Sequence, residues 1–164
     1  NFERTADYLS PKANVMRVGN PLRSAFVPMD KKTAKAKLGI PDGRVFVLSY
    51  GGSGGAEYLN ETVVEMLGKY IADREDIFYS HAAGSRDYSS TNERFCRYGL
   101  DRLKNVKLYE YIYDMPIQMA AADIIICRAG AMTVSELSMM KKASIMIPSP
   151  NVVDNHQKVN LQES

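Results

Sequence analysis

This sequence has few cysteines, a small net charge and no long hydrophobic run. Its 164 residues include only two cysteines, Cys96 and Cys127, which have no metal-like spacing and indicate a reducing compartment. We expect Cys127, inside an apolar run, to be a small buried residue. A formal net charge of +2 does not favour nucleic acid as a partner. Neither a metal nor a cofactor is expected.

Apolar runs are short throughout, and none approaches the roughly 20 residues of a membrane-spanning helix. The first four residues, Asn1 to Arg4, are polar and contain neither an initiator methionine nor a secretory signal. We therefore expect the sequence to come from the interior of a longer protein. A composition of 45% hydrophobic and 24% charged residues is ordinary for a globular protein, and the length suits one domain with its own core.

The segment Asp123–Leu137 predicts a strand, a glycine turn and a helix in succession. Ile124–Cys127 is a short, β-branched apolar run typical of a buried strand, and helical spacing begins at Met132. In a parallel sheet, such a turn brings the free N–H groups of the helix to the carboxyl edge, where phosphate binds well. Thr133 and Glu136 would add a hydroxyl and a carboxylate. The same two residues also fit a capping box, in which they only satisfy the helix terminus.

A second strand-to-helix turn, Gly51–Ala56, has almost no side-chain bulk. Its glycines would let backbone N–H groups approach a ligand, and Ser53 adds a hydroxyl. No lysine follows, which excludes a Walker A loop. Glu57 stands where a dinucleotide fingerprint has its third glycine, and the second strand ends in no carboxylate, so NAD is a poor fit. A tight connection without any ligand is the alternative.

Strands and helices alternate along the chain. Strands are expected at Val45–Tyr50, Ile77–His81, Val106–Tyr109, Ile124–Cys127 and Ser144–Ile147, and helices at Lys31–Leu38, Tyr58–Ala72, Ser89–Tyr98, from an Asp114 cap to Ala122, and from Met132. This order predicts an α/β domain with a Rossmann-like parallel sheet and helices on both faces. The chain stops where a helix covering the last strand would follow, so we expect a fragment.

Three further candidate sites also have ordinary explanations. Arg23 follows a rigid Gly-Asn-Pro turn and fits a solvated surface residue equally well. Tyr111, Ile112, Tyr113 and Met115 form an aromatic and apolar patch that suits a base-binding slot, although packing is the commoner reason for such a cluster. One of the two histidines, in the amide-rich loop after the last strand, fits a general base or a simple hydrogen-bonding residue.

Four motifs occur in order along the chain: GNPLR at 19–23, GGSGGA at 51–56, CRAGAMTVSE at 127–136, and IPSPN at 147–151 with NHQ at 155–157. Together they resemble the MurG family of bacterial transferases, which add N-acetylglucosamine (GlcNAc) to undecaprenyl-pyrophosphoryl-muramyl-pentapeptide in peptidoglycan synthesis. The resemblance implies the C-terminal half of a GT-B glycosyltransferase, a fold of two Rossmann-like domains facing each other across a cleft. Residues 1–18 would end the N-terminal domain and linker, and residues 19–164 would be the donor nucleotide-sugar-binding domain, truncated at its C-terminus.

The resemblance implies that five residues lie at the donor diphosphate of UDP-GlcNAc. Arg23 and Ser53 would contact the diphosphate or its neighbourhood. Ala131, Met132 and Thr133 would present the helix N-terminus to the phosphates. Departure of a UDP group builds negative charge on the diphosphate, and a fixed helix dipole with an arginine would stabilise that charge without reorganisation.

The resemblance also implies contacts to the rest of the donor. The backbone of Ile112 would meet the uracil, with Met115 close by, and Glu136 would hold the ribose, because a carboxylate accepts two hydrogen bonds from a vicinal diol. The sugar would be reached by three consecutive polar residues, Asn155, His156 and Gln157. Amide side chains donate and accept together, which sugar hydroxyls require, and a wrong epimer would leave one of them unpaired.

Two departures from the family pattern matter. Gly54 stands where the family usually has Gln, so any contact from that side chain is missing. Lys141-Lys142-Ala143 replaces the common Gly-Lys-Pro, and we expect a looser turn there. By the resemblance, the lipid I acceptor and the membrane surface belong to the N-terminal domain of a peripheral protein on the cytoplasmic side of the bacterial cell membrane. We therefore expect this chain to bind the donor weakly and to show no turnover.

Two alternatives remain open. A UDP-GlcNAc 2-epimerase-like enzyme of the same fold would need acid–base carboxylates beside the sugar, where Asp154 is the only acid. A non-catalytic Rossmann-like partner module would bind neither UDP nor UDP-GlcNAc.

Overall fold

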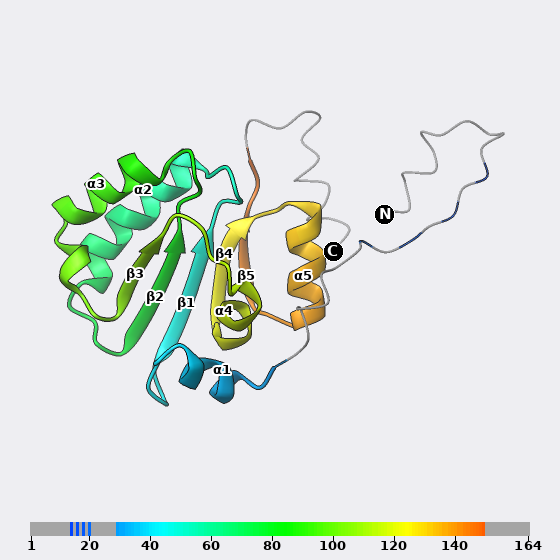
Figure 1. Cartoon of the computed structure of the whole chain (residues 1–164), viewed down its shortest axis with the longest axis horizontal. Helices are drawn as coiled ribbons and strands as arrows, with labels where there is room; N and C mark the ends of the chain where they lie inside the picture. The colour runs from blue at the N-terminus through cyan, green and yellow to red at the C-terminus, as the bar shows by residue number, and fades with distance from the viewer. Residues whose placement is uncertain (1–13, 15, 17, 19, 21–28, 150–164) are drawn as a thin grey trace.

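A five-stranded parallel sheet runs through the molecule (Figure 1). The computed structural model describes residues 14, 16, 18, 20 and 29–149. The strands stand in the order β3-β2-β1-β4-β5, and all four neighbouring pairs are parallel. Their bounds are β1 Val45–Tyr50, β2 Ile77–Ala82, β3 Val106–Tyr109, β4 Ile124–Arg128 and β5 Ser144–Ile147.

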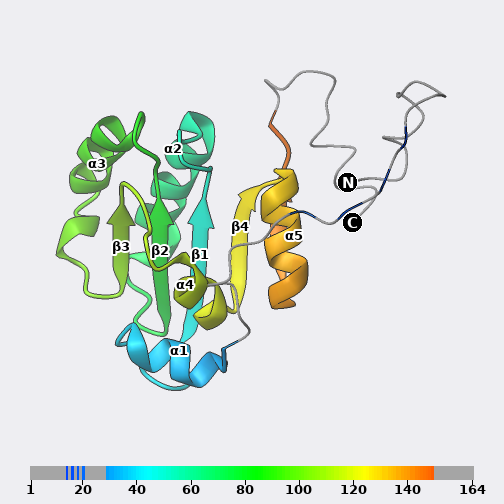
Figure 2. The same cartoon turned by 45° about the vertical axis from the view of Figure 1, so that its right-hand side comes forward.

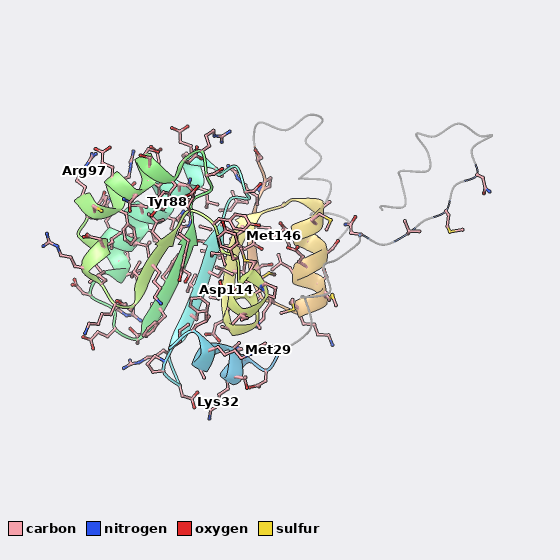
Figure 3. The ribbon with its side chains drawn as sticks, in the orientation of Figure 1. Met29, Lys32, Tyr88, Arg97, Asp114 and Met146 are labelled. Carbon is pink, nitrogen blue, oxygen red and sulfur yellow. The ribbon has the colours of Figure 1, made fainter. Side chains whose placement is uncertain are left out.

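Helices cover both faces of this sheet (Figure 2). They are α1 Lys31–Lys37, α2 Glu57–Met66, α3 Tyr88–Arg97, α4 Met115–Ala121 and α5 Ala131–Met140, with a π-helical turn η2 Leu67–Ile71 after α2 and a 3₁₀ turn η3 Leu100–Arg102. The pair α2 and α3 covers one face through a core that contains Val64, Leu67 and Phe95. On the other face, α4 and α5 enclose a core around Phe46 and Ile125. Charged side chains such as those of Lys32 and Arg97 point outward (Figure 3).

The strand order reverses between β1 and β4. The chain moves from β1 to β2 and β3 on one side, then returns to β4 and β5 on the other. Tyr50, at the carboxyl end of β1, lies opposite Ala82 of β2 and Cys127 of β4. Loops that leave neighbouring strands in opposite directions open a crevice at this point, which is where doubly wound sheets bind ligands.

The predicted α/β fold with a parallel sheet and helices on both faces is confirmed. Three of the five strands have the predicted bounds, and the other two extend one residue further. The helix predicted at Tyr58–Ala72 is α2 followed by the π-helical turn η2. Asp114 precedes α4 as predicted (Figure 3), but its side chain makes no capping hydrogen bond.

Two further findings concern membrane-spanning helices and the domain boundary. In the described residues, no helix combines the length and the apolar character that crossing a bilayer requires. The domain boundary predicted between residues 18 and 19 falls in a part of the chain that the structure describes only at single positions, and it remains a prediction.

Candidate functional site

A cavity of about 230 Å³ opens at the carboxyl edge of the sheet, beside the point where the strand order reverses. Its walls come from four places: the end of β1 and its glycine loop, the end of β2, the β3–α4 connection with the start of α4, and the middle of α5. They are formed by Tyr50, Gly52, Ser53, Ala82, Glu110, Tyr111, Ile112, Tyr113, Met115, Pro116 and Glu136. Four predicted site residues therefore share one cavity, namely Ser53, Ile112, Met115 and Glu136.

The glycine loop 51–55 is shaped by close contact with the turn that follows β2. A Cβ on Gly55 would lie 2.6 Å from the carbonyl oxygen of Ala83 and 2.5 Å from Asp87 Oδ2. A Cβ on Gly84 would lie 2.2 Å from the Gly55 nitrogen. Both positions also have positive φ, which favours glycine. These two glycines are therefore required by packing, which agrees with the tight connection that was the alternative for this loop.

Two other glycines of the same loop, Gly52 and Gly54, face open space. A Cβ on Gly52 or on Gly54 would meet no atom within 4 Å, and Gly52 lines the cavity. Ser53 lies between them and is exposed. The Ser85 amide donates to the Ser53 carbonyl at 3.1 Å, which ties the loop to the residues after β2. The loop thus has a packed base and an open tip beside the cavity.

The N-terminus of α5 is not closed by a side chain. The helix begins at Ala131, its N-cap is Gly130, and no described side chain makes a capping bond there. Thr133 is the third residue of the helix and Glu136 the sixth, so the capping box suggested by their spacing is wrong. Ala131, Met132 and Thr133 form the first turn, whose N–H groups give the positive end of the helix dipole.

Asn20 connects the GNPLR motif to this same first turn. Its Nδ2 donates to Ser135 Oγ at 2.7 Å and lies 3.3 Å from the Ala131 carbonyl oxygen. The Ser135 hydroxyl in turn donates to Ala131 O at 3.0 Å. Asn20 therefore contacts the start of α5 from more than 100 positions away in the sequence.

The backbone around Ile112 is firmly held, because its side chain is 3% exposed within the core. Met115 at the start of α4 is half-buried and packs against the same core. Glu136 reaches the same cavity from α5. The cavity thus combines apolar side chains with two carboxylates, those of Glu110 and Glu136.

Sequence reasoning missed Tyr50 and Glu110 as cavity residues. Tyr50 ends β1 and is 7% exposed, and among the described residues its hydroxyl has no hydrogen-bond partner. Burial raises the pKa of Tyr50, and the neighbouring Cys127 thiol and Glu136 carboxylate raise it further. Both residues stand at or just after the carboxyl ends of strands. Ligand sites form at this edge of a parallel sheet, so their position in the sequence could have predicted them as cavity residues.

Four predicted site residues, Arg23, Asn155, His156 and Gln157, lie outside the described residues. Arg128, at the end of β4, donates to the Pro148 carbonyl oxygen at 3.0 Å and so fixes the chain where it leaves β5. In the part of the chain that the structure describes, no three His, Cys, Asp or Glu side chains come together in a group that could hold a metal ion.

This arrangement defines the chain as a Rossmann-like α/β domain with a ligand cavity at the switch point of its sheet. Residues 45–163 match the model of the glycosyltransferase family 28 C-terminal domain, and the chain belongs to that family.

Known relatives match nearly the whole of this chain. The chain is 39% identical over 160 residues to the UDP-N-acetylglucosamine–N-acetylmuramyl-(pentapeptide) pyrophosphoryl-undecaprenol N-acetylglucosamine transferase of Acetivibrio thermocellus, and 37% identical to the same-named protein of Caldicellulosiruptor saccharolyticus. Each match covers 98% of this chain and 42% of the relative. The crystal structure of Acinetobacter baumannii MurG superposes with a TM-score of 0.65 at 27% identity, over 92% of this chain and 42% of that one. The chain therefore spans well under half the length of these relatives.

Proposed function

We propose that this chain is the donor-binding domain of an N-acetylglucosaminyltransferase and that its cavity binds UDP-GlcNAc. In the whole protein, the sugar would pass to an undecaprenyl-linked lipid I acceptor, giving lipid II, at the cytoplasmic side of the bacterial membrane. Because the chain spans 42% of its relatives, we expect residues 1–164 to bind the donor without turnover. The acceptor and the membrane surface would be contacted by the N-terminal domain, and nucleic acid is not expected as a partner.

One observation carries this proposal. Ser53, Ile112 and Glu136 come from three separate segments and line one cavity, and Glu136 is the sixth residue of α5. Each offers a different chemistry: a hydroxyl with open backbone near the phosphates, a fixed backbone for a base edge, and a carboxylate for a diol. A uridine diphosphate needs all three chemistries along its length.

The chemistry follows from charge. As the bond between the anomeric carbon of the sugar and the UDP oxygen breaks, negative charge grows on the diphosphate. The first turn of α5 presents uncapped N–H groups there, and their fixed dipoles stabilise the leaving group without reorganisation. Arg23 would add a positive charge. Glu136 would orient the nucleoside through the ribose hydroxyls, and Asn155, His156 and Gln157 would hold the sugar. Ala131, Met132 and Thr133 would act through their backbone.

Thermal unfolding with UDP-GlcNAc tests the proposal. A ligand present at 100 times its dissociation constant adds about 2.7 kcal/mol of stability, which for a chain of this size is a rise in Tm of roughly 5–10 °C. Glu136→Ala removes two charge-assisted hydrogen bonds to the ribose, so we expect affinity to fall at least about tenfold. The matched control is Glu93→Ala, which removes an exposed acid on α3 that pairs with Arg97.

Two outcomes would contradict the proposal. If neither UDP nor UDP-GlcNAc raises the Tm of the unmodified chain, a non-catalytic partner module becomes the better description. If Glu136→Ala and Glu93→Ala lower the Tm rise equally, the carboxylate in the cavity does not contact the ligand. Product analysis of the whole protein, glycosyl transfer against epimerisation, separates the transferase from the epimerase alternative.

A further inference from the structure

Two tyrosine rings stand at the cavity without being buried. The exposed fraction is 90% for Tyr113 and 40% for Tyr111, whereas Ile112 between them is 3% exposed. The ring centroids of Tyr111 and Tyr113 are 4.9 Å apart at an interplanar angle of 64°, an edge-to-face arrangement. Core packing therefore explains Ile112 but not Tyr113, whose ring keeps most of its surface in water.

The position of Tyr113 would let its exposed ring contact a ligand in the cavity. Tyr113 lines the same cavity as Met115 and Glu136. Its neighbour Ile112 is anchored in the core, so the backbone that carries the ring is held in place. Because Tyr113 is 90% exposed, a face of its ring is available to a flat partner. A planar group entering the cavity would cover this face and release the water on it.

We infer that Tyr113 is a further ligand-binding residue, whose ring packs against the pyrimidine base of the bound nucleotide. This inference rests on the proposed function, because it needs a nucleotide in the cavity. Stacking uses the face of the base and leaves its edges to the Ile112 backbone. Tyr113 therefore adds affinity without choosing the base, and Tyr111 packs beside its ring.

A single-tryptophan variant tests this contact directly. The chain contains no tryptophan, so Tyr113→Trp places the sole indole at the cavity mouth. We expect a saturable fluorescence change with UDP and with uridine, and none with GlcNAc-1-phosphate, which has no base. The matched control is Tyr70→Trp, because Tyr70 is 70% exposed and lies on η2, away from the cavity walls. Its fluorescence should not respond to any of the three ligands.

Affinity measurements complete the test. Base–aromatic stacking corresponds to roughly a five- to hundredfold difference in affinity. Tyr113→Ala should weaken UDP and uridine by the same factor within this range, and Tyr113→Phe should bind almost as tightly as the unmodified chain. The Tm of the free protein should change little with either substitution, because Tyr113 is exposed and Tyr113→Ala removes only its ring contact with Tyr111.

The outcomes separate this inference from the proposed function. In one outcome, UDP raises the Tm of the unmodified chain and Glu136→Ala abolishes this rise. If Tyr113→Ala then binds UDP as tightly as the unmodified chain does, and the fluorescence of Tyr113→Trp does not change with UDP, the stacking contact is refuted and the proposed function stands. If the unmodified chain binds no uridine ligand, both the inference and the proposed function fail.

Discussion

The imidazole of His81 is hydrogen-bonded on both sides in the core of the protein: Nδ1 lies 2.7 Å from Ser49 Oγ, and Nε2 lies 3.0 Å from Asn60 Oδ1. Asn60 Nδ2 donates to the Ala83 carbonyl, which leaves Oδ1 as the acceptor. His81 must therefore carry its proton on Nε2 and accept the Ser49 hydroxyl proton at Nδ1. This chain of bonds connects strands β1 and β2 to helix α2 just beneath the glycine loop.

The neutral state of His81 predicts a loss of stability in mild acid. Burial lowers the pKa of His81 to about 4, against about 6.5 for an unfolded histidine. Between these values the unfolded chain binds more protons than the folded chain, so stability is complete above pH 6.5 and falls as the pH drops toward 4. We expect a loss of about 3 kcal/mol over this window, measured by urea unfolding at several pH values.

The control is His81→Gln, which cannot titrate and should flatten this slope whatever its own stability. Asp123 affects stability at lower pH than His81 does. Burial alone would raise the pKa of Asp123, but hydrogen bonds from Lys31 and Lys35 bring it to about 2. Equal slopes in the unmodified chain and in His81→Gln would contradict the assignment.

The strands were predictable because a parallel sheet covered on both faces needs short, continuous apolar runs. VFVLSY and IIIC are such runs, and both are central strands. The helix ends were less predictable, because local patterns compete there. Thr133 and Glu136 have capping-box spacing, yet α5 begins at Ala131 and Gly130 is the N-cap. The strand that enters the sheet decides where the helix starts, and a four-residue pattern does not contain that information.

The site was predictable where it lies in motifs and unpredictable where it depends on register. Ser53 lies in a glycine turn and Glu136 in the helix that follows another one, and a parallel sheet brings such strand-to-helix turns to one edge. Tyr50 reaches the cavity only because β1 pairs in register with β2 and β4, so that it stands between Ala82 and Cys127. The partners of His81 likewise depend on three-dimensional packing, since Ser49 is 32 residues away.

Tyr50 should tolerate the loss of its hydroxyl. The hydroxyl is buried and meets no geometric hydrogen-bond criterion among the described residues, and its neighbour is the Cys127 thiol, which bonds only weakly. It therefore loses its water on folding and gains little in return. We expect Tyr50→Phe to raise the free energy of unfolding by about 1 kcal/mol, measured by urea unfolding. Tyr70→Phe, at a side chain that is 70% exposed, should change nothing. Destabilisation by Tyr50→Phe would instead mean that the hydroxyl has a partner, such as an ordered water.

The glycine loop offers a matched pair of substitutions. Gly55→Ala places a Cβ against a backbone oxygen, that of Ala83, at a φ of +92°, and should destabilise the protein by at least about 2 kcal/mol. Gly54→Ala meets no atom within 4 Å and should stay within about 0.5 kcal/mol of the unmodified chain. Urea unfolding measures both. Equal effects would show that the contact between this loop and the turn after β2 is not what holds the loop.

The last prediction concerns the turn after α5, because its backbone adopts a left-handed conformation. Lys141 caps the helix at φ +51° and ψ +48°, and it is the only non-glycine residue with positive φ among the described residues. The Lys142 amide donates to the Leu137 carbonyl at 3.2 Å, so the turn is closed where a looser one was expected. A residue with a Cβ is strained in this conformation by about 1–2 kcal/mol, whereas glycine adopts it freely.

Lys141→Gly should therefore raise the free energy of unfolding, measured by urea unfolding, by up to about 1 kcal/mol, after subtraction of the extra freedom that glycine gains in the unfolded chain. Lys141→Ala separates backbone strain from charge, because it removes the ammonium group but keeps the Cβ, and it should bring no comparable gain. If alanine stabilised the chain as much as glycine, the cause would be the lysine charge near Lys142, and the left-handed backbone would not be the source of strain.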